Sequence, residues 1–174
     1  GFRIIDVSDP EQPNELGSYN TPGSAQGVAT FGDFAIVADA HEYLRIIDVS
    51  DSENPDEIGY EGLHTPAYDV VVRDDLAYVA ALHGGLYVLD VSDPRQPNRE
   101  GFINTNGYAY AVAVDGNLAY VANHQSGLCI VDVSDPENLE VVGNFDTPHQ
   151  AHGIAVDGSI AYIADGNSGL RLID

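Results

Sequence analysis

A repeat of 42 residues runs through the whole chain and limits which folds it can adopt. The clearest marker is one aspartate that recurs at this interval with no insertion or deletion, at Asp6, Asp48, Asp90, Asp132 and Asp174. Glycines at positions 17, 59, 101 and 143 keep the same step. A strict period of this length is typical of a repeat architecture, in which each unit is one supersecondary structure that packs against its neighbours.

Each repeat contains four short apolar segments separated by turn residues. In one repeat they read AYAVAVD, LAYVAN, LCIVDV and EVVGNF. They are rich in Val, Ile, Tyr and Phe, and several alternate with a period of two, which favours β-strands. The first two are joined by Asp115-Gly116, a pair typical of tight hairpins because glycine adopts the positive φ of the turn. Four antiparallel strands in 42 residues predict an all-β protein whose unit is one blade of a β-propeller.

The period divides the chain into blades. We predict complete blades at 25–66, 67–108 and 109–150 and partial blades at 1–24 and 151–174, with the segments 25–31, 67–73, 109–115 and 151–157 innermost. The last six residues, GLRLID, repeat the opening GFRIID, so closing four blades into a ring would leave one strand redundant. The sequence therefore predicts an arc of a larger, seven- or eight-bladed propeller, which self-association or a protein partner completes. Such a ring needs about 290–340 residues at this period, and we expect the chain to be part of a longer or processed protein.

The charge of the chain excludes several classes of partner. Asp and Glu total 28 against six Arg and no Lys, which gives a formal net charge of −22. This charge repels phosphate backbones and anionic lipid, so we expect neither nucleic acid nor a membrane surface as a partner. No apolar run approaches about 18 residues, so membrane insertion is not expected. Two interpretations of the acids stay open: a solvated surface suited to a high-salt environment, or a cation-binding surface.

The polar stretch DVSDP at 90–94 follows the third strand of its repeat. Ser92 and Asp93 are expected to bond backbone N–H groups one or two residues ahead, and Pro94 then ends the strand. Because these acids recur at the same corner of every repeat, we interpret them as turn formers rather than as metal ligands or catalytic groups. The single cysteine, Cys129, lies within a strand and is interpreted as a packed thiol without chemistry.

The third strands carry the motif of a known family. The segments LRIID, LYVLD, LCIVD and LRLID, followed by V-S-D where the chain continues, resemble the LVIVD-repeat family of bacterial and archaeal proteins. The resemblance implies a β-propeller and a place on secreted or cell-surface proteins, and it brings no enzymatic activity. Ser52, Leu139 and Tyr43 depart from the motif and weaken individual turns.

The six histidines all fall in loops or strand starts that a propeller places on one face. His41, His83 and His124 lie between the second and third strands, and His64, His149 and His152 lie in or just after the crossing to the next blade. Neutral imidazole is the commonest transition-metal ligand. We predict a small inner set, His149 and His152 with His64, that binds a divalent ion such as Zn²⁺ or Ca²⁺. The other three histidines are expected at a solvent-facing rim, and a purely polar or pH-sensitive rim is the alternative.

No catalytic constellation is visible in the sequence. The recurring serines at 8, 50, 92 and 134 have no local histidine, and no glycine-rich loop precedes a helix. The expected function is therefore a secreted or cell-surface propeller that binds or scaffolds a protein or another ligand, with no catalytic residue and no cofactor beyond a divalent ion. The alternative is a metal-dependent enzyme with a histidine-lined site on the loop face near the central channel.

Overall fold

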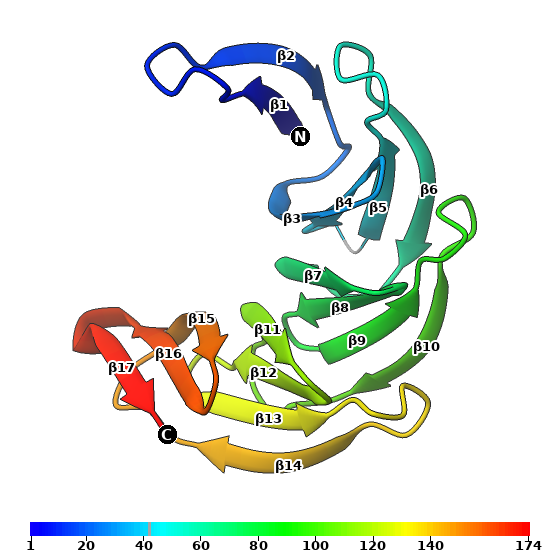
Figure 1. Ribbon diagram of the computed structural model, residues 1–174. Helices are drawn as coiled ribbons and strands as arrows, with labels where there is room; N and C mark the ends of the chain where they lie inside the picture. The colour runs from blue at the N-terminus through cyan, green and yellow to red at the C-terminus, as the bar shows by residue number, and fades with distance from the viewer. Residues whose placement is uncertain (42) are drawn as a thin grey trace.

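The chain folds into an open arc of antiparallel β-sheets that follow one another around a common centre (Figure 1). The computed structural model describes residues 1–41 and 43–174. Three sheets have four strands each, the N-terminal sheet has two, and the C-terminal sheet has three. The prediction of four-stranded blades with a 42-residue repeat, arranged as an arc, is confirmed.

The strands follow the order expected for blades, from inner to outer. The N-terminal pair is β1 (Phe2–Asp6) and β2 (Asn14–Tyr19). The first complete blade contains β3 (Ala25–Phe31), β4 (Phe34–Asp39), β5 (Tyr43–Asp48) and β6 (Asp56–Gly62). The second contains β7 (Asp69–Arg73), β8 (Leu76–Ala81), β9 (Gly85–Asp90) and β10 (Asn98–Ile103). The third contains β11 (Ala111–Asp115), β12 (Leu118–Ala122), β13 (Leu128–Asp132) and β14 (Glu140–Phe145). The last sheet contains β15 (Ala151–Asp157), β16 (Ile160–Asp165), the short 3-10 helix η1 (Gly166–Ser168) and β17 (Leu170–Ile173).

The inner strands β3, β7, β11 and β15 line the centre of the arc and contact one another in sequence (Figure 1). Each forms a hairpin with the next strand through a residue in the left-handed region. That residue is glycine in three blades, with φ of 57° at Gly32, 55° at Gly116 and 58° at Gly158. In the remaining blade Asp74 takes the position with φ 53°, which aspartate tolerates better than most residues. The Asp-Gly hairpins are therefore found where the sequence predicts them.

The hydrophobic core lies between blades rather than within one layer. Leu44 and Ile46 of β5 pack against Leu89 and Val91 of the following blade. Further buried clusters fill the next two junctions, and a smaller one joins the first complete blade to the N-terminal strand pair. Each blade therefore needs a neighbour to bury both faces of its sheet, as expected for a repeat protein.

The DVSDP stretch forms the predicted turn, with one correction to its acceptors. Asp90 Oδ1 accepts a hydrogen bond from the backbone N–H of Ser92 at 2.8 Å, and Asp93 Oδ1 accepts one from Arg95 N–H at 3.1 Å. The first acceptor is thus Asp90 and not Ser92, whose hydroxyl and N–H instead donate and lower the pKa of the Asp90 carboxyl. The same turn recurs at Asp6, Asp48 and Asp132.

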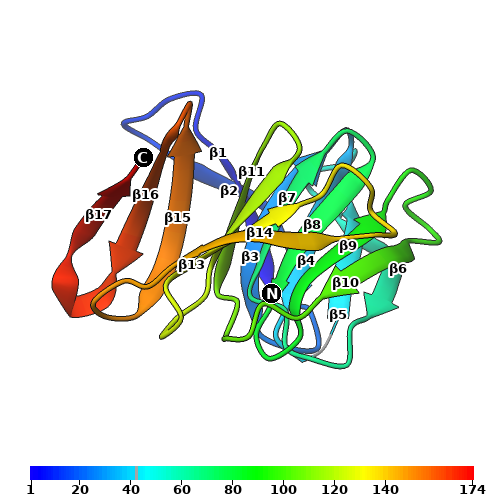
Figure 2. The ribbon, with the colours of Figure 1, turned by 90° about the horizontal axis from the view of Figure 1, so that it is seen from below.

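The turn also explains the repeated glycine of the outer strand. A Cβ at Gly59 would collide with the carbonyl oxygen of Pro94, and one at Gly101 would collide with that of Pro136. Each DVSDP turn therefore rests on the outer strand of the preceding blade, and only glycine allows the close approach. The turns and crossings gather at the two edges of the arc (Figure 2).

The arc stays open between β1–β2 and β15–β17 (Figure 1). Among the strands of the described residues, β2 and β17 do not pair, and each sheet at an end of the arc has fewer than four strands. The described part of the chain contains no helix with the length and apolar character needed to cross a membrane.

Candidate functional site

Loops from neighbouring blades pair along one edge of the arc. The loop after β8 and the crossing into β11 exchange two backbone hydrogen bonds, between Leu82 and Ala109, at 3.1 and 3.0 Å. The loop after β12 and the start of β15 do the same through His124 and Ala151. This edge therefore joins the two kinds of loop that carry the histidines, and it brings residues from successive blades into contact.

An aromatic–imidazole cluster occupies this edge near the inner strands. It consists of three tyrosines and three histidines from three blades, namely Tyr68, Tyr108, Tyr110, His83, His124 and His152. The ring of His124 stacks on Tyr110 with centroids 5.0 Å apart, and it lies edge-on to His152 at 5.1 Å. Tyr110 also contacts His152 at 5.0 Å, so these three rings form the centre of the cluster.

His124 is the half-buried histidine of the cluster. Its Nδ1 is buried and has no hydrogen-bond partner within the described residues. Burial lowers the pKa of His124, and the nearby His152 and His149 lower it further because a second positive charge would be repelled. The imidazole is therefore held neutral at physiological pH, the form that can ligate a metal. The sequence predicts His124 at the solvent-facing rim, whereas the structure places it beside His152.

The three predicted metal ligands lie in different surroundings. His152 is exposed and contacts Tyr110 and His124. His149 instead donates its backbone N–H to Asp165 at 3.2 Å, and its Nε2 lies 3.3 Å from Asn167 Nδ2. His64 is exposed in a different crossing with φ 58°. Within the described residues no three His, Cys, Asp or Glu side chains are grouped closely enough to hold a metal ion.

The metal site of the sequence analysis stays a prediction, and Zn²⁺ titration tests it. We expect wild-type protein to bind Zn²⁺ and the His149→Ala/His152→Ala double variant to bind at least about tenfold more weakly. A His41→Ala variant serves as control, because His41 lies in a loop of another blade. Isothermal titration calorimetry measures all three, and equal affinities for wild type and double variant contradict the prediction.

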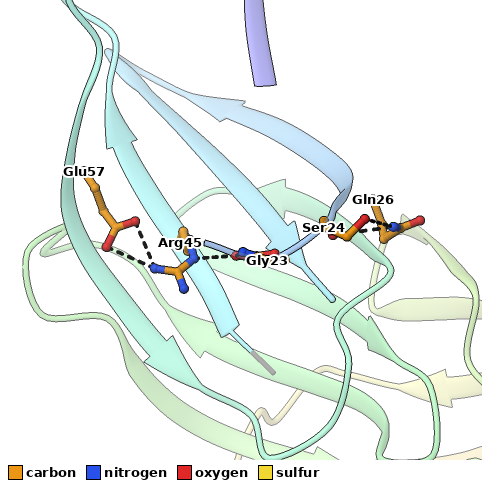
Figure 3. Close-up of polar contacts among 6 residues, drawn as sticks. Gly23, Ser24, Gln26, Arg45 and Glu57 are labelled. Carbon is orange, nitrogen blue, oxygen red and sulfur yellow. Dashed lines mark hydrogen bonds and ion pairs between the residues drawn. The ribbon is translucent and has the colours of Figure 1, made fainter. Parts of the chain in front are cut away.

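A second group of polar residues, absent from the sequence analysis, anchors the crossing into the first complete blade (Figure 3). Asp39 is fully buried at the end of β4 and accepts the backbone N–H of Gly23 at 3.1 Å. Arg45 of β5 donates from Nε to the same carboxylate at 2.6 Å and from Nη1 to Glu57 at 3.0 Å. Burial alone would lower the pKa of the Arg45 guanidinium, but its hydrogen bonds to Asp39 and Glu57 outweigh burial and raise the pKa.

The other blades carry different pairs at the same two positions. Asp165 pairs with Arg171 at 3.6 Å. In the second complete blade Ala81 and Tyr87 take these places, and the Tyr87 hydroxyl donates to the carbonyl oxygen of Leu63. In the third, Asn123 exchanges hydrogen bonds with Thr105 and the partner position is Cys129, so the pairs are Asp39–Arg45, Ala81–Tyr87, Asn123–Cys129 and Asp165–Arg171. The two positions vary together, a signal that was present in the repeat columns of the sequence.

Cys129 lies in the core between the second and third complete blades. Burial raises the pKa of its thiol to about 11, so the thiolate is not formed at neutral pH. This agrees with the interpretation as a packed thiol.

Comparisons with known proteins assign the fold and the repeat. The family model for the LVIVD repeat matches five segments, at residues 1–21, 22–60, 66–105, 106–147 and 148–174. No curated protein matches the chain. The computationally designed Ika4 protein is similar in structure, with a TM-score of 0.75 and 10% sequence identity over 92% of this chain and 97% of that one. The designed Ika8 protein has a TM-score of 0.73 and 10% identity, and the match covers 92% of this chain but 49% of Ika8.

Proposed function

Because the chain belongs to the LVIVD repeat family, we propose that it is a secreted or cell-surface scaffold module that binds a second copy of itself through the open ends of the arc. One observation carries this proposal. Each end of the arc presents apolar side chains at the repeat positions that are packed against a neighbouring blade elsewhere in the molecule.

The C-terminal end face is formed by β17. Leu170 is 65% exposed and Leu172 is 60% exposed. The equivalent residues of the preceding blade, Leu128 and Ile130, pack in the cluster that joins it to the last sheet. The exposed pair therefore has the side chains of a blade junction, and no described residue covers them.

The N-terminal end face supplies the complementary positions. Ile5 is 43% exposed and Val7 is 68% exposed. Their equivalents, Leu89 and Val91 in one blade and Val131 and Val133 in the next, pack against the Leu and Ile or Val positions of the preceding blade. An interface between the C-terminal face of one copy and the N-terminal face of another would repeat this packing.

Such a contact is head-to-tail, because it joins two different surfaces of the chain. Head-to-tail contacts give a ring if the rotation closes and an open chain of copies if it does not. A location outside the cell or at its surface rests on the family resemblance and on the acidic composition, which suits a solvated surface.

Size-exclusion chromatography with light scattering tests the self-association. Salt of about 0.5 M is required, because it screens the net charge of −22 to within a few ångströms. We expect wild type to show a molar mass above that of the 18.5 kDa monomer, rising with concentration. The Leu172→Asp variant should stay monomeric, since it buries an unpaired charge in the new junction.

The control is Tyr60→Asp, which places the same charge at an exposed residue of β6, at a repeat position that stays exposed beside a neighbouring blade, as Phe102 does in the next one. This variant should associate as wild type does. A wild-type protein that is monomeric at every concentration overturns the proposal, as does equal association by Leu172→Asp.

A further inference from the structure

We propose that a pocket at the junction of the second and third complete blades binds a neutral carbohydrate. The pocket has a volume of about 430 Å³ and is lined by seven residues, here called the junction pocket: His83, Asn104, Asn106, Gly107, Tyr108, Gln125 and Ser126. Its size lies within the range of about 300–1,000 Å³ that is usual for small-molecule sites. It lies at the outer end of the aromatic–imidazole cluster, and the predicted metal ligands do not line it.

The lining of the junction pocket is unusual for this protein because it contains no carboxylate and no arginine. The chain as a whole has 28 Asp and Glu residues. A hard divalent cation such as Ca²⁺ prefers carboxylate ligands, which the pocket does not offer, and a transition metal would find a single imidazole there, that of His83. An anion would find no guanidinium there and would be repelled by the net charge of −22. The lining therefore favours a neutral ligand.

Three side-chain amides and a hydroxyl provide the polar part of the pocket. Two of these groups already form hydrogen bonds within the protein. Asn104 Oδ1 accepts the backbone N–H of Asn106 at 2.7 Å, and Ser126 Oγ donates to the Asn106 carbonyl at 3.1 Å. The side-chain amides of Asn106 and Gln125 make no hydrogen bond to any described residue. Each amide presents both donors and an acceptor, which matches the adjacent hydroxyl groups of a sugar.

Tyr108 provides an aromatic surface beside these amides. It is 41% exposed, although its ring is fixed by neighbours on two sides. His83 lies edge-on to it with centroids 4.6 Å apart, and His124 lies at 5.8 Å. A rigid aromatic ring loses little conformational entropy when a ligand binds, and the C–H face of a sugar can pack against it.

The junction pocket is not a requirement of the blade fold. The positions equivalent to Tyr108 in the neighbouring blades are Pro66 and Gln150, and those equivalent to Asn106 are His64 and Pro148. The first complete blade forms its four-stranded sheet and the last sheet its three strands although both lack this tyrosine and this asparagine, so the blade fold does not require them. A compact pocket at one junction also suits a sugar better than an extended peptide, which needs a groove or an edge.

Binding is tested with the full chain and defined neutral trisaccharides: maltotriose, cellotriose, mannotriose and the N-acetylglucosamine trimer. Calorimetry and ¹⁵N chemical-shift mapping should show binding of at least one of them, with shifts at the junction pocket. Trigalacturonic acid should not bind, because it is anionic. Tyr108→Ala should weaken binding at least about tenfold, and Gln125→Ala, at an exposed side chain, should weaken it without affecting folding.

Two controls make the outcome decisive. Asn106→Gly removes the amide but keeps the backbone, whose φ of 57° glycine adopts freely, and it should also weaken binding. Tyr60→Ala removes an exposed tyrosine of β6 outside the pocket and should leave binding unchanged. Failure of all four neutral sugars to bind overturns the proposal, as does binding that Tyr108→Ala and Gln125→Ala leave intact. Equal binding of N-acetyl-trialanine amide at the same residues would assign the pocket to peptides and overturn it too.

Discussion

Replacing Arg45 with alanine is expected to lower the free energy of unfolding by about 3–5 kcal/mol, the cost of removing one partner from a buried ion pair. Arg45 is buried, and it neutralises the fully buried carboxylate of Asp39 at 2.6 Å. Without the guanidinium, the N–H of Gly23 is the one hydrogen-bond donor that Asp39 keeps among the described residues. Urea denaturation followed by circular dichroism measures the loss.

Arg171→Ala is the matched control for this prediction. Arg171 occupies the equivalent position in the last sheet, but it is exposed and its Nε lies 3.6 Å from Asp165. Asp165 is as fully buried as Asp39, but its partner guanidinium is exposed to solvent and more distant, so we expect a loss of about 1 kcal/mol or less. Equal losses for Arg45→Ala and Arg171→Ala would show that burial of the arginine does not determine how much the pair stabilises the fold.

The repeat also suggests a repair of the Arg45→Ala defect. In the second complete blade the same two positions are Ala81 and Tyr87, and the Tyr87 hydroxyl donates to a backbone carbonyl. The double variant Asp39→Ala/Arg45→Tyr copies this pair and leaves no buried charge. It should unfold at a higher urea concentration than Arg45→Ala, because replacing both partners of a buried pair costs less than removing one.

These pairs show which part of the structure the sequence could predict. The aspartate of DVSDP recurs in every repeat, so its role had to be local to the blade, and the turn at Asp90 confirms this. The repeat position of Asp39 holds Ala81, Asn123 and Asp165 in the other blades. Because the residue type at this position differs from blade to blade, the position taken alone does not indicate a shared role. The role of Asp39 in an ion pair can be recognised only when its repeat position is compared with that of Arg45, because the two positions vary together.

Contacts between side chains of different blades could not be predicted from the sequence in the way that the fold could. The sequence correctly indicates which loops share an edge, since that follows from strand order. It does not indicate which side chains meet across a junction. His124 was therefore expected at the rim, although its loop pairs with Ala151 and brings its ring to 5.1 Å from His152. His149 stays a predicted ligand, and its Nε2 lies beside Asn167 Nδ2.

The glycine that precedes the third strand is the other position where a small change should have a large effect. Gly127 has φ 67°, and a Cβ there would collide with the carbonyl oxygen of Phe145 and lie 2.5 Å from the backbone nitrogen of Thr147. Gly127→Ala therefore combines a left-handed backbone with a clash against the strand end that leads into the next crossing. We expect a loss of about 4 kcal/mol in the free energy of unfolding, measured by urea denaturation.

Gly169→Ala separates the two causes. Gly169 is the equivalent residue of the last sheet and has a similar φ of 75°, but no atom lies within 4 Å of a Cβ built there. Gly169→Ala should therefore lower the free energy of unfolding only through the strained backbone, by about 1–3 kcal/mol. The difference between the two variants thus measures how rigidly β14 and its crossing hold their place against β13. If Gly127→Ala loses no more than Gly169→Ala, the crossing yields to the added methyl group, and the glycine is kept for its φ and not for the close approach.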